Sequence, residues 1–252
     1  MVAGSMIAVV ALLTGALAGC EHVVEGFGVR ASTSTSVDAP DPAPADDAVV
    51  AMARPSVVKV RAVAPSCQKV REGTGFVVSP TKVLSMAHVV AGGETVTVDV
   101  DGSQHDARVV SFDPNADFAI LDVPVLPARL LGFSIAPAQV GTEVLMLGYP
   151  GAGPFAATPA RIRELSHLEG PDIYRTTTVS RNVYQISGVG QVQMQGLSGG
   201  PVIDLNGQVL GVVLGQDVDH PDIGIVIAAE QVTPQLSALG NTDEVATGAC
   251  IN

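Results

Sequence analysis

The chain has 252 residues, of which 47% are hydrophobic and only 15% charged, enough to bury the core of one large domain or two small ones. Its formal net charge is -12 and it has no basic cluster, which argues against a nucleic-acid partner because phosphate binding needs grouped Lys and Arg. Aromatic residues make up 4% and Trp is absent, whereas Val and Gly are frequent. This composition favours short strands joined by tight turns and predicts an all-β fold.

The chain begins with an apolar segment. Residues 2–19 carry no charge and precede Cys20. Such a segment suits a signal peptide or a short membrane-spanning helix, since about 20 apolar residues cross a bilayer. The letters LAGC at 17–20 resemble a bacterial lipobox, whose cysteine is lipidated, although no Lys or Arg precedes the apolar run. We expect 1–20 to be a signal or lipobox, or a membrane anchor; a wrongly assigned start codon is the third alternative. All three place the rest outside the cytoplasm.

A segment rich in Ser, Pro, Ala and Asp comes next. Residues 31–47 show no apolar periodicity, so we expect 21–47 to be a flexible linker. From residue 48 the pattern changes to short β-type runs separated by turn signals. Six of these runs predict a first barrel over about 48–125: SVVKVRAV, GTGFVVSP, KVLSMAHVV, TVTVDV, ARVVSF and FAILDV.

A second barrel is predicted over about 135–240, after a Pro-containing connection. Its six runs are TEVLMLGYP, ARIRELSHL, VYQISGV, PVIDL, QVLGVVLG and GIVIAA. Asn206-Gly207 between two of them is typical of a type I′ hairpin turn, because both residues tolerate positive φ. The run AAEQVTPQLSALG has helix-like spacing and predicts a short C-terminal helix that ends at Gly240. We therefore expect two packed antiparallel six-stranded barrels within a folded unit of residues 48–252.

Two cysteines lie near the two ends of the folded region, Cys67 and Cys250. In an exported protein, two such thiols most simply form a disulfide. Closing so long a loop would contribute on the order of 5 kcal/mol at most in the chain-entropy model. The alternative is a pair of buried free thiols. The chain has no Cys and His cluster with metal-ligand spacing, so we expect no metal site.

The glycine-rich turn GLSGGP at 196–201 carries a candidate nucleophile, Ser198. A nucleophile on a sharp turn needs neighbours without Cβ, so that a substrate can approach and backbone N–H groups can converge on one point. The N–H groups of Gly196 and Ser198 would supply two such donors, forming an oxyanion hole. Taken alone, a Gly-Ser turn is more often only a tight loop.

A serine hydroxyl needs a base at neutral pH, and histidine has the most suitable pKa. His88 lies in the apolar run KVLSMAHVV, where an imidazole needs a hydrogen-bond partner. The other four histidines lie in polar or loop segments: His22, His105, His167 and His220.

The base must in turn be oriented by an ionised carboxylate. Three aspartates follow His88 in FDPNADFAILDV: Asp113, Asp117 and Asp122. Asp113 precedes Pro, which is typical of a turn, and Asp122 lies at the end of the predicted strand. Asp117 stands at the entry of the apolar run, where its carboxylate would be partly buried. We choose Asp117 as the partner of His88.

Four motifs occur in a fixed order along the chain: GTGFVVSP, SMAHVVAG, DPNADFAIL and GLSGGPVID. Their order and spacing resemble those of trypsin-like (chymotrypsin-fold) serine proteases, in which His, Asp and Ser follow one another as His88, Asp117 and Ser198 do here. Over about residues 38–252 the chain is similar to the MarP-type periplasmic serine proteases of mycobacteria and related actinobacteria.

This resemblance implies a serine endopeptidase of the cell envelope that forms an acyl-enzyme and needs no cofactor. It implies protein or peptide substrates, a tether to the membrane, a part in acid and oxidative stress tolerance and a redox-relevant disulfide between Cys67 and Cys250. We expect a monomer. By family position, Val192 lies at the base of the pocket for the residue on the acyl side of the cut bond, with Val213 and Gly215 in the same pocket. No carboxylate is present there, which predicts cleavage after apolar or small residues.

Leu197 departs from the family pattern, in which a polar residue, often Asp, precedes the nucleophile. In digestive relatives that Asp pairs with a newly freed N-terminus and shapes the oxyanion hole. Leu197 cannot form an ion pair, so we expect packing to hold the loop. The alternative function is a catalytically impaired, peptide-binding envelope protein in which Leu197 misplaces the oxyanion loop.

Overall fold

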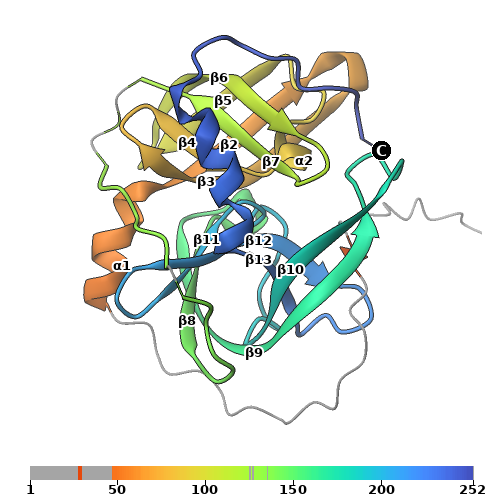
Figure 1. The fold of residues 1–252 in the computed structure, drawn as a ribbon. Helices are drawn as coiled ribbons and strands as arrows, with labels where there is room; N and C mark the ends of the chain where they lie inside the picture. Colours follow the sequence, from red (N-terminus) through yellow and green to blue (C-terminus); the bar gives the residue numbers. More distant parts are fainter. Residues whose placement is uncertain (1–27, 30–46, 125, 127, 135, 252) are drawn as a thin grey trace, which may run out of the picture.

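The computed structural model describes residues 28–29, 47–124, 126, 128–134 and 136–251 (Figure 1). The predicted leader 1–20, with Cys20, lies outside these residues. So does the predicted linker 21–47, except for residues 28, 29 and 47. Among the described residues, no helix is long and apolar enough to cross a membrane.

The first barrel is formed by six antiparallel strands that pair in the closed order β2-β3-β4-β7-β6-β5 (Figure 1). They are β2 (Val57–Ala64), β3 (Lys69–Ser79), β4 (Lys82–Ser85), β5 (Thr95–Val100), β6 (Ser103–Asp113) and β7 (Phe118–Asp122). In β2, Val60 and Ala62 are buried while Arg61 between them is exposed. This alternation places every second side chain in the barrel interior, as a half-buried strand requires.

The second barrel uses six further antiparallel strands. They are β8 (Glu143–Gly148), β9 (Ala156–Pro171), β10 (Thr178–Ser187), β11 (Pro201–Asp204), β12 (Val209–Asp217) and β13 (Gly224–Ala228). Because β12 pairs with both β11 and β13, these strands also close on themselves. The short strand β1 (Gly28–Val29) adds to β12 in parallel, opposite Gln216 and Asp217. The prediction of two antiparallel six-stranded barrels is confirmed.

The helical segments are short and differ from the sequence prediction in three places. Helix α1 (Asp47–Ala53) precedes the first barrel and was not predicted. The run KVLSMAHVV is not one strand, because the chain leaves β4 at Ser85 and forms the one-turn helix α2 (Ala87–Val90). The predicted closing helix forms as a 3-10 helix over Thr233–Gly240, where Pro234 at its start removes a backbone donor.

The hairpin between β11 and β12 also differs from the prediction. Gly207 has φ +81, but Asn206 is not among the residues with positive φ, so the turn is not type I′. The Asp204 carboxylate accepts hydrogen bonds from the N–H groups of Asn206 and Gln208, at 2.9 and 2.8 Å. These bonds favour a turn in which only the glycine adopts the left-handed conformation.

The C-terminal tail crosses the outside of the first barrel (Figure 1). Val245 N donates to Val109 O at 2.8 Å and Gly92 N donates to Thr247 O at 3.0 Å. The structure joins Cys250 of this tail to Cys67, with their Cα atoms 6.1 Å apart. The tail thus returns to the start of the first barrel.

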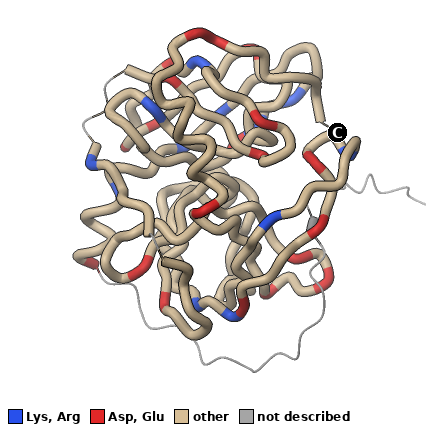
Figure 2. The backbone as a smooth tube through the Cα atoms, in the orientation of Figure 1, with Lys and Arg blue, Asp and Glu red and all other residues tan. Residues whose placement is uncertain are grey.

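Charged residues are dispersed over the molecule. Lys and Arg lie on both barrels, interspersed with Asp and Glu, and do not gather into a stripe in this view (Figure 2). The largest fully buried side chains are aliphatic or aromatic and belong to both barrels. Buried apolar side chains thus fill both barrels, and the polar groups described next lie in turns within each barrel: on α2, before β7 and before β11.

Candidate active site

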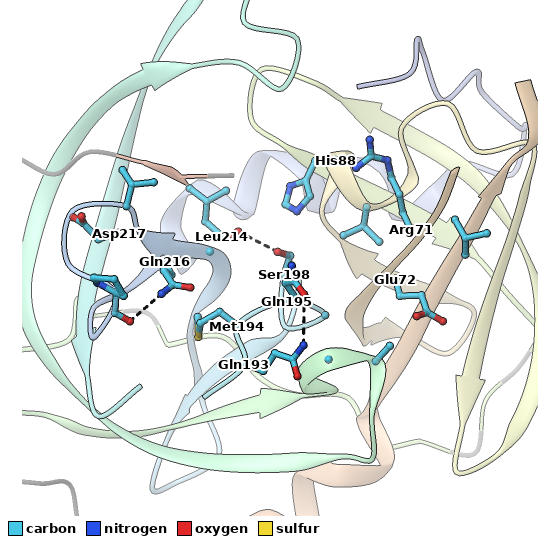
Figure 3. Close-up of a pocket in the computed structure, with 18 of the residues that line it drawn as sticks. Arg71, Glu72, His88, Gln193, Met194, Gln195, Ser198, Leu214, Gln216 and Asp217 are labelled. Atoms are coloured by element: carbon cyan, nitrogen blue, oxygen red, sulfur yellow. Dashed lines mark hydrogen bonds between the residues drawn. The ribbon is translucent and has the colours of Figure 1, made fainter. Parts of the chain in front are cut away.

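A cavity of about 760 Å³ opens between the two barrels. Leu214, Gly215 and Gln216 of β12 line one side, and Arg71 and Glu72 of β3 line the other. In Figure 3, His88 and Ser198 lie between these two walls. Both barrels thus contribute walls to the cavity.

The first barrel contributes a buried pair, His88 and Asp117. The Nδ1 atom of His88 lies 2.7 Å from Oδ2 of Asp117, and the backbone N–H of His88 donates to Oδ1 at 2.8 Å. The carboxylate is 1% exposed and His88 is 8% exposed. Because an ionised carboxylate only accepts hydrogen bonds, Nδ1 carries the proton and Nε2 is the basic nitrogen. This is the tautomer that a general base facing a serine needs.

The backbone at Asp117 is unusual, which explains how its carboxylate reaches His88. Asp117 has φ 62, a left-handed conformation that Asp tolerates better than most residues. Its carbonyl accepts a hydrogen bond from Ala87 N at 3.2 Å, while its side chain accepts from His88. One residue before β7 therefore holds both the backbone and the ring of the one-turn helix α2.

The two other aspartates considered from the sequence have different partners. Asp113 Oδ1 accepts the N–H groups of Asn115 and Ala116, as a turn-forming carboxylate does. Asp122 pairs with Lys82 at 2.5 Å and also with Arg108. The hydrogen bond from Lys82 is the largest cause that lowers the pKa of Asp122, with Arg108 adding to it and burial opposing it. Asp117 is thus the member of this set that meets His88.

A buried cation that the sequence did not indicate lies near this aspartate. Arg181 of β10 is 5% exposed and donates to Asn115 O at 2.8 Å. Burial lowers the pKa of Arg181, and the negative charges of Asp117, Asp172 and Asp113 oppose that shift. Arg181 therefore links the second barrel to the loop that precedes Asp117. A single Arg in an alternating strand gave no signal for this role.

Ser198 lies in the turn before β11 and lines the cavity together with His88. Its hydroxyl donates to Leu214 O at 3.2 Å (Figure 3). A hydroxyl has one proton and can serve one acceptor fully, so transfer to His88 requires the proton to turn away from Leu214.

The N–H of Gly196 is directed by the carbonyl of the same peptide group. Gly151 N donates to Gln195 O at 2.6 Å. In a trans peptide the C=O and N–H bonds point in opposite directions, so the Gly196 N–H points away from Gly151. Gly196 has φ +82, and a Cβ on it would lie 2.4 Å from Tyr149 O. Only glycine fits this position without displacing the backbone.

The N–H of Ser198 is directed in the same way. Gly200 N donates to Leu197 O at 2.8 Å, which turns the Ser198 N–H to the opposite side of that peptide. Within the described part of the chain, neither the Gly196 N–H nor the Ser198 N–H has an acceptor. Two backbone donors beside the serine, with no acceptor among those residues, are what an oxyanion hole consists of.

Leu197 is buried in the second barrel and does not face the cavity. It is 1% exposed and packs in a cluster that includes Val144 and Met146. Its N–H donates to Met194 O at 3.1 Å. A Cβ on Gly148 would lie 2.8 Å from Leu197 Cδ2, so the leucine packs closely against the backbone of β8.

The sequence-predicted substrate pocket is found only in part. Gly215 lines the cavity, but Val192 and Val213 are not among its lining residues. Val213 is fully buried, because the strand alternation turns its side chain into the core of the second barrel, and Val192 packs against the same cluster. Met194, which the sequence reasoning missed, lines the cavity instead.

Comparison with known proteins identifies the family. The family described as a trypsin-like peptidase domain matches residues 73–212, which is more than half of the 252 residues. The chain belongs to this family. The serine protease Rv3671c of Mycobacterium tuberculosis is 54% identical over 217 residues, which cover 86% of this chain and 54% of the relative. A probable periplasmic serine endoprotease, DegP-like, of Brucella suis is 29% identical, covering 69% of this chain and 34% of that protein.

Solved structures of the same family agree with the fold. The crystal structure of the Rv3671c protease from M. tuberculosis in its active form matches with a TM-score of 0.83 at 50% identity, covering 91% of this chain and 100% of that one. The inactive form of that protease matches with a TM-score of 0.69, covering 79% of this chain and 98% of that one. The chain spans about half the length of the first curated relatives it matches.

Proposed function

We propose that this chain is a serine endopeptidase that cleaves peptide bonds through a triad of Ser198, His88 and Asp117. The observation that carries the proposal is that the carboxylate-bound His88, Gly196 and Ser198 line one cavity, and that the N–H groups of Gly196 and Ser198 have no acceptor among the residues that the structure describes. Membership of the trypsin-like peptidase family supports it. Greater similarity to a structure described as active than to one described as inactive supports a formed site.

In the proposed reaction, the Ser198 hydroxyl leaves Leu214 O and gives its proton to Nε2 of His88 as Oγ attacks the substrate carbonyl carbon. The negative charge that develops on the carbonyl oxygen is stabilised by the N–H groups of Gly196 and Ser198. His88 then protonates the leaving amine, and the acyl group remains on Ser198. Water, deprotonated by His88, hydrolyses the ester and restores the serine. Asp117 stabilises the imidazolium in both halves without being protonated.

We place the acyl side of the substrate along β12. Met194, Leu214 and Gly215 line this side and bring no charge. Asp217 also lines the cavity, but its carboxylate accepts the N–H groups of Asp219 and His220 at 2.8 and 3.0 Å. Both bonds are made by Oδ1, and Asp217 is only 1% exposed, so the carboxylate is turned into its own loop. We therefore propose apolar or small residues before the cut bond. Cleavage of a peptide library mainly after Arg would contradict this.

We further propose that the enzyme acts in the cell envelope, outside the cytoplasm. A DegP-like relative is named as periplasmic, and a disulfide between Cys67 and Cys250 suits an oxidising compartment. A tether through residues 1–20, a monomeric state and a part in acid or oxidative stress remain proposals that rest on the sequence resemblance.

The experiment that tests the proposal compares the purified chain with its Ser198→Ala variant on a mixture of peptides, at neutral and acidic pH and with and without reductant. We expect cleavage by the first protein only, with both proteins folded by circular dichroism. The rival function, a peptide-binding protein without turnover, predicts that both bind the peptides and neither cleaves them.

A further inference from the structure

Thr74 of β3 connects the first barrel to the loop that carries Ser198. Its side chain is fully buried. Its hydroxyl donates to Gly196 O at 2.6 Å and accepts the N–H of Tyr149 at 3.1 Å. Its own N–H donates to Ser198 O at 2.9 Å. One residue of the first barrel therefore holds two carbonyls of the candidate oxyanion loop in the second barrel.

These bonds complete a row of fixed peptide groups. The carbonyls of residues 195, 196, 197 and 198 are bound by Gly151 N, the Thr74 hydroxyl, Gly200 N and Thr74 N, respectively. Three of these four donors are backbone groups. The Thr74 hydroxyl is the one supplied by a side chain, so it is the one that a substitution can remove without changing the chain path.

The position of this hydroxyl matters because its acceptor belongs to a glycine. Gly196 lacks a Cβ and moves more readily between backbone conformations than any other residue type. Rotation of the peptide between residues 196 and 197 would leave Gly196 O buried without its donor and would turn the Leu197 N–H away from Met194 O. This peptide lies between the two peptides that carry the Gly196 and Ser198 N–H groups. Binding Gly196 O therefore fixes the segment that sets the spacing of the two oxyanion donors. Leu197, which forms no ion pair, only packs against the core.

We infer that Thr74 is a positioning residue that fixes the peptide between Gly196 and Leu197, and with it the relative placement of the two oxyanion donors, in place of the Asp-to-N-terminus ion pair that Leu197 rules out. The inference rests on the proposed serine endopeptidase. Thr74 does not touch the substrate; it acts through the peptide between Gly196 and Leu197. The Thr74 hydroxyl has both of its roles filled, because it donates once and accepts once, and valine of nearly the same shape can do neither.

The test compares Thr74→Val with Thr74→Ser in the full oxidised chain. Loss of one oxyanion donor lowers kcat by about 10²- to 10³-fold in proteases, so a displaced donor in Thr74→Val should lower kcat by about 10- to 100-fold. KM for a peptide should change by less than about threefold, because the ground-state carbonyl depends little on this donor. Thr74→Ser keeps the hydroxyl and should stay within about threefold of the original kcat.

Thr97→Val is the matched control. Thr97 is a buried threonine of β5 in the same barrel, 7% exposed, and it does not line the cavity. The same substitution there should leave kcat unchanged. If Thr74→Val does not fold, Thr74→Ala against Thr74→Ser isolates the hydroxyl on the same methyl-free background, at a temperature at which both are folded.

A second readout separates positioning from general loosening. A peptide aldehyde forms an adduct with Ser198 that places an oxyanion in the same site, so its affinity should fall in Thr74→Val by about the same factor as kcat. The pH midpoint of kcat should not move, because Thr74 does not contact His88. Equal kcat in Thr74→Val and the original chain, or an equal loss in Thr74→Ser, would overturn the inference. If the unmodified chain neither cleaves peptides nor binds the aldehyde, the proposed endopeptidase itself fails.

Discussion

The two barrels prepare their parts of the site by different means. The first barrel contributes His88, whose ring and backbone both bind one buried carboxylate. The second barrel contributes Ser198 and two N–H groups, which are directed by bonds to the carbonyls of neighbouring peptides. One half of the site is thus set by side chains and the other by the backbone. We therefore expect kcat to fall when a side-chain functional group of the first half is changed, and when a backbone conformation of the second half is changed.

Asp117→Asn tests the side-chain half and should have the largest effect. An amide at 117 no longer imposes the Nδ1-protonated tautomer or stabilises the imidazolium, and the equivalent change in a serine protease triad costs about 10⁴-fold in kcat. We expect a loss of that order, measured by peptide hydrolysis. Asp122→Asn is the control, since that carboxylate pairs with Lys82 and Arg108 away from the cavity. It should reduce stability and leave kcat intact. Similar kcat losses in both variants would contradict the assignment of Asp117.

Gly196→Ala tests the backbone half. A Cβ there would lie 2.4 Å from Tyr149 O at φ +82, so the loop must shift and the donor moves. We expect kcat to fall by about 10²- to 10³-fold.

Gly207→Ala is the matched control for that substitution. Gly207 has φ +81, and a Cβ there meets only the flexible end of Met52. Both variants carry the cost of a left-handed alanine, on the order of 1 kcal/mol. Gly207→Ala should therefore lose stability and keep kcat, and equal kcat in the two variants would show that the loop conformation does not matter.

Removing the disulfide tests how far the position of His88 depends on the C-terminal tail that the disulfide ties to the first barrel. Ile251, next to Cys250, packs with Ala87 and Ala91 on either side of His88. Replacing Cys67 and Cys250 by Ser should lower the free energy of unfolding by about 2–4 kcal/mol. Because α2 loses part of its packing, kcat should fall by up to about tenfold.

Reductant is the control for the disulfide prediction. Reductant should lower the free energy of unfolding of the original protein by about as much as the two Cys→Ser substitutions do. It should not change the free energy of unfolding of the doubly substituted protein. Two thiols that react with an alkylating agent in the untreated protein would contradict the pairing.

The smallest expected effect concerns the contact between the two halves. Asp172 lies in the second barrel, at the start of the loop after β9. The next residue of this loop, Ile173, donates its N–H to Pro114 O at 3.3 Å. Pro114 belongs to the first barrel, in the segment before Asp117. Burial alone would raise the pKa of Asp172, but hydrogen bonds from Thr176 and Thr177 outweigh it and hold the pKa at about 2.

A carboxylate with a lowered pKa stabilises the fold above its unfolded pKa, near 4, and loses that contribution as the pH falls through about 2. Asp172→Asn should therefore lower Tm at neutral pH, with the difference shrinking between about pH 4 and 2. Thermal melts of both proteins across this range measure it. A Tm difference that stays constant down to pH 2 would contradict the role of the charge.

The sequence indicated candidates for both halves of the site but not what holds the backbone half. It singled out His88, Asp117, Ser198 and the Gly196 turn, because a polar group in an apolar run or a glycine-rich turn needs an explanation. The structure places His88 against Asp117, and His88, Gly196 and Ser198 on one cavity. Thr74 could not be found, because a threonine in a strand is an ordinary β-former and its partners are carbonyls that are distant in sequence.

The fold shows the same division. Apolar runs predicted both barrels, because the side chains that a strand buries can be recognised in the sequence. The type I′ turn at Asn206-Gly207 and the strand through His88 were wrong, because local hydrogen bonds decided the backbone there. The pocket residues Val192 and Val213 were placed by family position, but the packing of the second barrel turns them away from the cavity.

The most direct test of the account is covalent labelling of the oxidised chain by a fluorophosphonate, followed by intact mass spectrometry, without prior proteolytic activation. A site already formed by both barrels predicts nearly one label per molecule, at Ser198, and none in Ser198→Ala. No labelling of the folded protein, or equal labelling of both proteins, would contradict it.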